Sequence, residues 1–240
     1  MDLAGYVALT RQSGLLKEIQ SVANNIANIS TTGFRREGVI FAEMLQRLPT
    51  EGGSVAMTAA RGRYTDDLQG ALVQTGGALD MAIEGEGFFT VLTPEGERLT
   101  RAGAFTRSAT GEVVTPDGHP LLDEGGGAIV IPFEANDIGL AADGTISVNG
   151  EPVARVGLVT IEDQTRVFRE GGVLFRAEGG TAPLEGGRVL QGYLEQSNVN
   201  AVAEMSRMIM VQRAYEYGQK IMDGEDERIR LAMRTLGPKG

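Results

Sequence analysis

Several residue types with special chemistry are rare or absent in this chain of 240 residues. It contains no cysteine, no tryptophan and one histidine, His119. Without cysteine there can be no disulfide bond and no thiol catalysis, and one histidine cannot form a multi-histidine metal site. His119 lies between Gly118 and Pro120, a sequence typical of a turn. These absences argue against thiol chemistry and against a histidine-rich metal centre.

The charge balance and hydropathy argue against two further classes of protein. The chain has 22 basic and 32 acidic residues, a net charge of −10, and only 5% aromatic residues. Nucleic-acid binding usually needs a basic surface and aromatic stacking platforms. No run of 18 apolar residues is present, so we expect no membrane span. The first residues lack the basic and apolar regions of a secretory signal peptide, so we expect none.

Motifs that carry catalysis or bind cofactors are also missing or incomplete. No Gly-x-Ser-x-Gly motif is present, and residues 85–87 lack most of the phosphate-binding fingerprint. The acidic residues at 223–227 do not match the spacing of a calcium loop. Glu84 and Glu86 could imitate a glycosidase carboxylate pair, but they lie beside a turn and nothing marks a cleft. We therefore predict no catalytic residue, cofactor or metal ligand.

The middle of the chain has the character of a β domain. The chain is 42% hydrophobic, with 34 glycines against 8 prolines, which favours a real core with many turns. Between residues 75 and 196, short apolar runs alternate with turn sequences such as Asp143-Gly144 and Asn149-Gly150, which predict hairpins. No long helical segment interrupts them, so the sheets should be mainly antiparallel. Residues 35–74, with a break at 49–54, are interpreted as a connector.

The C-terminal arm, residues 197–240, is predicted to be a long helix. Asn198 or Asn200 can cap its start, and Glu204 lies in its first turn, where the helix dipole favours an anion. Its apolar residues recur at alternating steps of three and four, with interruptions at Gly218 and Glu225. Fully helical, the arm would span roughly 55–60 Å. A small domain cannot bury that length, so the arm needs a partner helix.

The N-terminal arm, residues 1–34, carries a matching apolar stripe that ends near Gly33. We expect the two stripes to pack together. The residues concerned are Leu15, Ile19, Val22 and Ile26 in the first arm and Met208, Val211, Tyr215 and Met222 in the second. The predicted fold class is α+β, with long N- and C-terminal helices paired like a coiled coil and a mainly antiparallel β domain between them.

Several segments carry a specific resemblance to a known family. The following segments occur in this order along the chain: the asparagine-rich run 23–35, residues 75–89, residues 100–105 followed by 116–118, and the C-terminal segments 192–200 and 208–216. Together they resemble the signatures of the flagellar rod and hook proteins, the axial components of the bacterial flagellum. The opening residues, the short length and residues 197–205 favour a proximal-rod subunit, with a distal-rod subunit as the alternative.

The resemblance implies a structural role. Members of the family polymerise into a helical shaft that crosses the periplasm, with helices in the inner layer and the β domain outside. The implied partners are copies of this chain, neighbouring proximal- and distal-rod subunits and the flagellar type III export apparatus, which exports such subunits unfolded and without a cleaved signal peptide. An enzyme acting on peptidoglycan and a soluble ligand-binding β domain stay open as remote alternatives.

The two stripes and the resemblance together give the residues expected to mediate assembly. Besides the stripes they include the polar and turn residues of the signatures: Asn24, Asn25, Asn28, Gly33, Phe34, Ser197, Asn198, Asn200, Gln212, Arg213 and Glu216. Because the stripes are interrupted, we expect the arms to be largely disordered in an isolated subunit. Residues 75–190 should fold without them.

Overall fold

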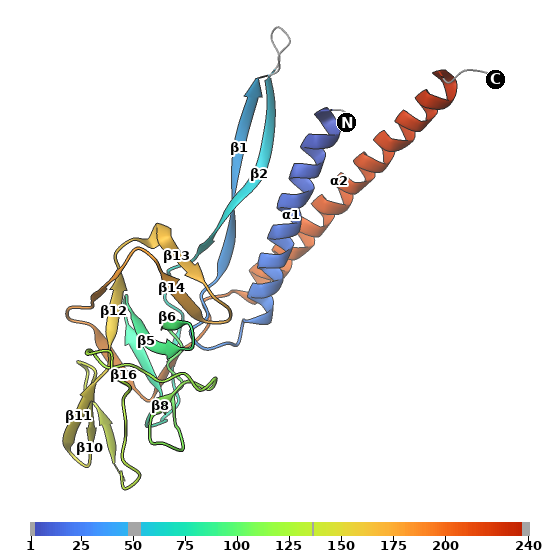
Figure 1. Ribbon diagram of the computed structural model, residues 1–240. Coiled ribbons are helices and arrows are strands. Elements are labelled where there is room, and N and C mark those ends of the chain that lie inside the picture. The colour runs from blue at the N-terminus through green and yellow to red at the C-terminus, as the bar shows by residue number, and fades with distance from the viewer. Residues whose placement is uncertain (1–2, 48–53, 136, 237–240) are drawn as a thin grey trace. The chain divides into compact units, whose positions relative to one another are not determined.

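The computed structural model describes residues 3–47, 54–135 and 137–236 (Figure 1). Within them the chain has one α-helix near each end, α1 (Leu3–Ala27) and α2 (Ala201–Leu236), with strands between. The chain divides into two compact units. The helical unit comprises Met1–Ala27, Arg36–Asp66 and Asn200–Gly240, and the β unit comprises Asn28–Arg35 and Asp67–Val199. Each unit is therefore built from segments that are distant in sequence.

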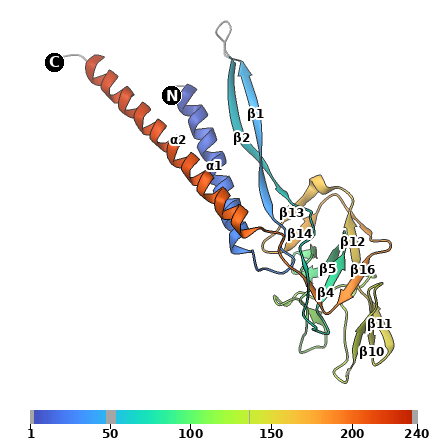
Figure 2. The same cartoon turned by 180° about the vertical axis from the view of Figure 1, so that it is seen from behind.

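In the helical unit, α1 and α2 run antiparallel beside a long β-hairpin (Figures 1 and 2). The hairpin consists of β1 (Glu37–Arg47) and β2 (Ser54–Thr65), which pair antiparallel with one irregularity between Ile40 and Phe41. Both strands contact α1. The hairpin lies within the predicted connector, and the predicted break at 49–54 falls almost entirely outside the described residues.

The start of α2 follows from its sequence. The side-chain oxygen of Asn200 accepts a hydrogen bond from the Ala203 amide at 3.0 Å, so Asn200 is the N-cap. Asn198, the other candidate cap, instead donates to the Leu68 carbonyl at 2.8 Å. Glu204 occupies the first turn as expected. The helix then continues for 36 residues without a proline.

The predicted fold class is wrong, because the two helices do not form a long coiled-coil pair. The described residues contain two helices and many antiparallel strands, and α1 and α2 diverge toward their free ends (Figures 1 and 2). The predicted stripe of α2 is uncovered beyond Met222, where Ile229 and Ala232 are exposed. Leu9 and Leu16 of α1 are exposed as well.

Local packing explains why the coiled coil does not form. Where the helices meet, the Gln12 side chain donates to the Tyr215 carbonyl at 2.9 Å. It lies against Gly218, where an added Cβ would come within 2.7 Å of the Gln12 amide nitrogen. A glycine offers no knob to a facing helix. In addition, α1 packs against the hairpin as well as α2, so its apolar face is shared between two partners.

In the β unit, every strand pairing found among the described residues is antiparallel. The largest sheet has the order β13-β14-β6-β5-β12-β15. Smaller sheets pair β16 with β4, β17 with β3, β7 with β8, and β9 to β11 with one another. The strands are β3 Leu72–Gln74, β4 Met81–Glu84, β5 Phe88–Thr93, β6 Gly96–Thr100, β7 Thr106–Arg107, β8 Val113–Val114, β9 Ile138–Leu140, β10 Thr145–Val148, β11 Glu151–Arg155, β12 Leu158–Ile161, β13 Val167–Arg169, β14 Leu174–Ala177, β15 Thr181–Pro183, β16 Arg188–Gln191 and β17 Tyr193–Glu195.

The β unit has its own hydrophobic core. Strands β4, β5 and β10 contribute buried residues such as Met81, Phe89 and Ile146. The Phe89 and Phe105 rings pack edge to face, with centroids 5.5 Å apart. The Asn149-Gly150 hairpin is confirmed: both residues have positive φ (50° and 87°), and β10 pairs with β11 around them.

Candidate assembly site

Asn25 joins the first helix to the hairpin and to the second helix. Its side chain is fully buried. The side-chain amide donates to the Glu37 carbonyl at 2.8 Å and to a Glu204 carboxylate oxygen at 3.2 Å, and the Glu37 amide donates to the Asn25 side-chain oxygen at 2.9 Å. One asparagine therefore connects the end of α1, the start of β1 and the first turn of α2.

An ion pair strengthens the same junction. The Arg36 guanidinium donates to a carboxylate oxygen of the buried Glu204 at 2.6 Å. This hydrogen bond is the main cause of the raised pKa of Arg36. Arg36 also lies 3.9 Å from the Asp66 carboxylate. Charge at the first turn of α2 is thus neutralised by an arginine just before β1, which fixes the two elements relative to each other.

Two further polar contacts hold α1 against α2. Arg207 pairs with Glu18, with nitrogen–oxygen distances of 2.8 and 2.9 Å. One turn further along α2, Val211 is buried. The Gln12 hydrogen bond to Tyr215 forms the third contact between the helices. The helix interface therefore combines polar pairs with a short apolar stretch.

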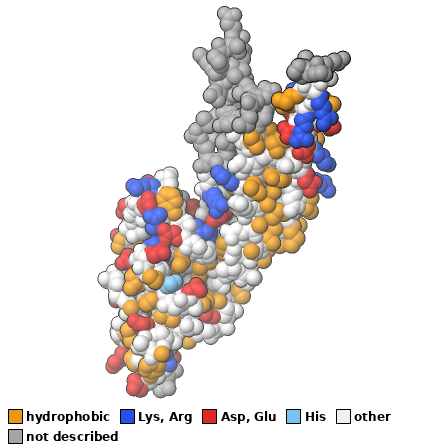
Figure 3. Space-filling model, turned by 45° about the vertical axis from the view of Figure 1, so that its right-hand side comes forward, with side chains coloured by type: hydrophobic (Ala, Val, Ile, Leu, Met, Phe, Trp, Pro, Cys, Tyr) orange, Lys and Arg blue, Asp and Glu red, His pale blue; other side chains and the backbone are white. Residues whose placement is uncertain are grey.

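The opposite face of α2 carries exposed apolar side chains. Because each helical residue turns by about 100°, Val202, Met205 and Ile209 lie on a face that points away from Glu204 and Val211. Hydrophobic side chains gather along the helices in Figure 3. The residues of this outer face are 51–74% exposed: Val202, Met205, Ile209, Met210, Tyr217, Ile221 and Leu231. Exposed apolar side chains gathered on one face of a helix are typical of an interaction site.

In the β unit, the signature segment 28–35 is held by aromatic and charged groups. Phe34 is buried, and the Arg169 guanidinium lies 4.5 Å from its ring centroid and 4.6 Å from that of Phe175. Gly33 has a positive φ of 69°, and an added Cβ would come within 2.3 Å of the Ala102 amide nitrogen. Glycine is required at this close approach.

Arg35 belongs to a buried ion-pair cluster. Its guanidinium lies 3.3 Å from one carboxylate oxygen of Glu195, and the Arg101 guanidinium lies 3.3 Å from the other. All three residues are buried. Burial lowers the pKa of Arg101 to about 10, against the attraction of Glu195. Two guanidinium groups therefore share one carboxylate out of contact with water.

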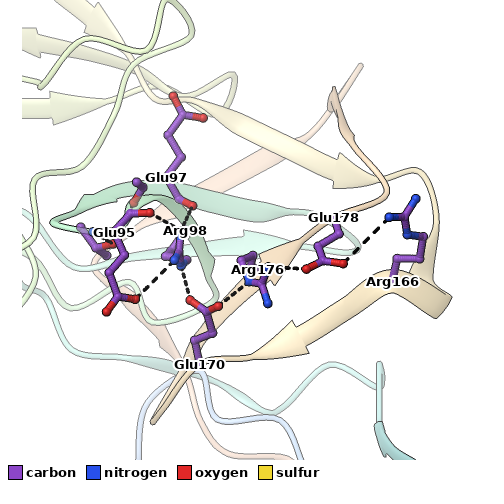
Figure 4. Close-up of polar contacts among 9 residues, drawn as sticks. Glu95, Glu97, Arg98, Arg166, Glu170, Arg176 and Glu178 are labelled. Carbon is purple, nitrogen blue, oxygen red and sulfur yellow. Dashed lines mark hydrogen bonds and ion pairs between the residues drawn. The ribbon is translucent and has the colours of Figure 1, made fainter.

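A second ion-pair network lies across the largest sheet (Figure 4). Acidic and basic residues alternate along it, and they lie in or next to strands β6, β13 and β14. In order, the members are Glu95, Arg98, Glu170, Arg176, Glu178 and Arg166. Burial opposes the ionisation of Glu170, but hydrogen bonds from Arg98 and Arg176 outweigh it, and the pKa of Glu170 lies below its ordinary value.

The residues predicted to mediate assembly differ in burial and belong to both units. Val22 and Val211 are buried, and the other stripe residues from Leu15 to Met222 are partly buried: Leu15, Ile19, Ile26, Met208, Tyr215 and Met222. Gln212, Arg213 and Glu216 are exposed on α2. The signature residues are divided between the two units.

The polar signature residues mostly bind backbone or side chains nearby. Asn24 contacts a Glu37 carboxylate oxygen at 3.5 Å. Asn28 accepts a hydrogen bond from the Thr31 hydroxyl at 3.1 Å, and the Ser197 hydroxyl accepts one from the Val199 amide at 3.3 Å. These contacts stabilise the ends of helices and turns.

Sequence reasoning missed the ion pair of Arg36 with Glu204 and the buried cluster of Arg35, Arg101 and Glu195. Arg35, Arg36 and Glu37 form a charged run at the end of the signature segment, and this run was the available signal. Glu195 gave no signal, because a glutamate at the end of a strand is ordinarily solvated.

Comparisons with known proteins match three parts of the chain. Residues 6–35 match the family described as "Flagella basal body rod protein". Residues 82–148 match "Flagellar hook protein FlgE/F/G D1 domain", and residues 190–235 match "Flagellar basal body rod FlgEFG protein C-terminal". The chain belongs to the flagellar basal-body rod proteins. It is a structural rod subunit of a family that is not an enzyme family, located in the basal-body rod, and membership implies assembly with other rod and hook subunits.

Full-length relatives refine this assignment. The chain is 41% identical over 242 residues to the flagellar basal-body rod protein FlgF of Caulobacter vibrioides, covering 99% of both chains. It is 38% identical to FlgF of Rhizobium meliloti, covering 99% of both. FlgG of Bacillus subtilis is 31% identical, covering 92% of this chain and 94% of the relative. Among these relatives the chain resembles FlgF more than FlgG.

The described residues include no candidate membrane span and no candidate metal site. Neither α1 nor α2 combines the length and apolar character that a membrane crossing requires. Over the same residues, no three acidic or histidine side chains gather in a way that could hold a metal ion.

Proposed function

We propose that this subunit polymerises in the proximal part of the rod and helps to transmit torque, without enzymatic activity of its own. The proposed partners are further copies of the chain and neighbouring proximal- and distal-rod subunits. The location proposed is the periplasm, reached through the flagellar type III export apparatus. The family resemblance implies that FlgF is the proximal-rod protein and FlgG the distal-rod protein, so the greater similarity to the FlgF relatives supports the proximal position.

The observation that carries this proposal is the outer face of α2. Side chains such as Met205, Ile209 and Tyr217 are exposed although they are apolar. Burying each against a neighbour is worth roughly 1.5–3 kcal/mol. Contacts that repeat between subunits without closing produce an open filament, as a rod requires. The predicted residues Gln212, Arg213 and Glu216 lie on the same helix and are proposed to contact neighbours at its edge.

The proposal is tested by placing a charge on this face. Ile209→Asp should leave the purified subunit folded, because Ile209 is exposed, but should prevent incorporation into basal bodies. An unpaired carboxylate buried in an interface costs several kcal/mol. The measurement is soft-agar motility and immunodetection of the subunit in purified basal bodies, in cells that lack the unaltered chain. Gln219→Asp, on an exposed polar position of the same helix, is the matched control.

Two results would contradict the proposal. The first is normal incorporation and motility of Ile209→Asp. The second is equal loss with Gln219→Asp, because the defect would then not depend on the apolar face. Crosslinking from position 209 to a distal-rod subunit alone would replace the proximal position with the distal one.

A further inference from the structure

Two segments from opposite ends of the chain meet inside the β unit. Residues 28–35 follow α1 in the chain, and residues 195–199 lead into α2. The Gly33 amide donates to the Glu195 carbonyl at 2.7 Å, and the Asn198 amide donates to the Phe34 carbonyl at 3.3 Å. The two linkers therefore bind each other directly through their backbones, although their order in the sequence places them far apart.

The Glu195 side chain binds three parts of the β unit at once. One carboxylate oxygen accepts from the Gly70 amide at 3.1 Å and pairs with Arg35, and the other pairs with Arg101. Glu195 is 1% exposed. It is also next to Gln196, whose carbonyl lies so close to Gly70 that an added Cβ would come within 1.8 Å of its oxygen. No water competes for these bonds at such burial.

The charges in this cluster do not balance. Arg35 and Arg101 supply two positive charges and Glu195 supplies one negative charge, all buried. The Nε atom of Arg35 and the Nη1 atom of Arg101 are buried without a hydrogen-bond partner. Removing one arginine would leave a neutral pair, whereas removing the carboxylate would leave two buried positive charges facing each other. Replacing Glu195 should therefore destabilise the cluster more than replacing either arginine.

We infer that Glu195 is the positioning residue of an electrostatic clamp, formed with Arg35 and Arg101, that holds both linkers together. The clamp fixes the two points at which the chain leaves the β unit toward α1 and α2. Phe34, which is buried beside the Arg169 guanidinium, anchors one linker, and the β17–β3 pairing anchors the other. The clamp couples these two anchors, so the linkers are ordered together or released together.

The inference predicts which amides lose protection in full-length variants. In Glu195→Gln, hydrogen exchange at the Gly33 and Asn198 amides should accelerate together by about a hundredfold, because breaking a buried pair is costly. Trypsin should also cleave faster after Arg35. The Leu121 amide, which bonds within the core, should keep its protection. Glu84→Gln, at an exposed pair with Arg188, is the matched control and should change none of these.

Removing one of the two buried positive charges tests whether the clamp is electrostatic. Arg35→Gln alone should have a smaller effect on the Asn198 amide than Glu195→Gln. Combining Arg35→Gln with Glu195→Gln should restore part of the protection of Asn198 lost in Glu195→Gln, since one uncompensated positive charge is removed. If Arg35 and Glu195 contributed independently, the two losses would add.

Four outcomes would overturn the inference. The Gly33 and Asn198 amides could stay protected in Glu195→Gln, or only one of them could be released. Leu121 could lose protection as well, which would mean that the whole unit opens. Lastly, the double variant could be worse than Glu195→Gln.

Discussion

The Asn25 side chain takes the place of a missing neighbour of strand β1. Its amide group accepts from the Glu37 amide and donates to the Glu37 carbonyl, as a backbone peptide on a paired strand would. Ser21 adds a hydrogen bond to the same carbonyl at 3.2 Å. A helix side chain therefore completes the hydrogen bonding at the first residue of the hairpin, which explains an asparagine near a helix end.

Replacing Asn25 should weaken the helical unit. Asn25→Ala leaves the buried Glu37 amide without its acceptor and removes a donor from Glu204, at a cost of about 2–4 kcal/mol. Hydrogen exchange at the Glu37 amide and urea unfolding followed by helical circular dichroism measure the loss. Gln20→Ala, on an exposed position of α1, is the control and should change stability by less than about 0.5 kcal/mol. Equal effects of the two substitutions would contradict this account.

Single residues show how far the sequence can be interpreted. Asparagine is unfavourable inside helices, so an asparagine run near a helix end suggests side chains that hydrogen-bond their neighbours. Asn25 binds the Glu37 backbone, and Asn28 accepts from the Thr31 hydroxyl. The partners of Asn25 could not be predicted, since Glu37 and Glu204 come from elements whose positions depend on the fold. Glu204 itself was placed correctly in the first turn of α2, but its ion pair with Arg36 needed the structure.

At the scale of elements, the spacing of apolar residues predicts which face of a helix is buried, but it does not predict which element packs against that face. The stripes of α1 and α2 follow helical periodicity, and both helices exist. The two helices contact each other, but the long coiled-coil pair expected from the stripes does not form, because part of the α1 surface packs against the hairpin of β1 and β2. The second apolar face of α2 escaped notice because only the heptad seam was followed.

The ion-pair network across the largest sheet should make the β unit sensitive to acid. The lowered pKa of Glu170 means that its pairs stabilise the fold at pH values above about 4.3, the ordinary value for glutamate. This contribution is lost as the pH falls below that value and through the folded pKa. Glu170→Gln should therefore show a flatter fall of Tm between neutral and acidic pH than the unaltered chain.

The matched control for this prediction is Glu97→Gln. Arg98 binds the backbone carbonyl of Glu97 at 2.9 Å, and Figure 4 shows the Glu97 side chain pointing away from the network. Thermal unfolding from pH 7 to pH 3 measures both variants. Parallel curves for Glu170→Gln and the unaltered chain would show that the network makes no pH-dependent contribution.

At the scale of the whole molecule, the β unit is discontinuous in sequence. It needs segment 28–35 in addition to residues 67–199, whereas the sequence predicted a continuous domain at 75–196. Whether residues 75–190 fold alone stays a prediction, as does the disorder of the arms in an isolated subunit. Composition reveals hairpins and turns, but a short segment that joins from a distant part of the chain has no periodic signal.

The contribution of the distant segment can be measured with shortened chains. Residues 67–199 should unfold cooperatively, because the core cluster from Met81 to Val189 lies within them. Their Tm should be lower than that of residues 28–199, since Phe34 and Arg35 are missing and Arg169 and Glu195 lose partners. Equal Tm values, or the absence of a cooperative transition in residues 67–199, would contradict this expectation.

The position of Glu195 late in the chain also determines when the clamp can form during folding. A chain that emerges with its amino end first presents Arg35 and Arg101 long before Glu195, whose carboxylate pairs with both. Until Glu195 is available, the two arginines lack their shared partner and the Gly33 amide lacks its backbone acceptor. The contact between residues 28–35 and residues 195–199 therefore forms late in folding. The segment after α1 and the segment before α2 are joined only when almost the whole polypeptide is available, so the clamp forms when the chain is nearly complete.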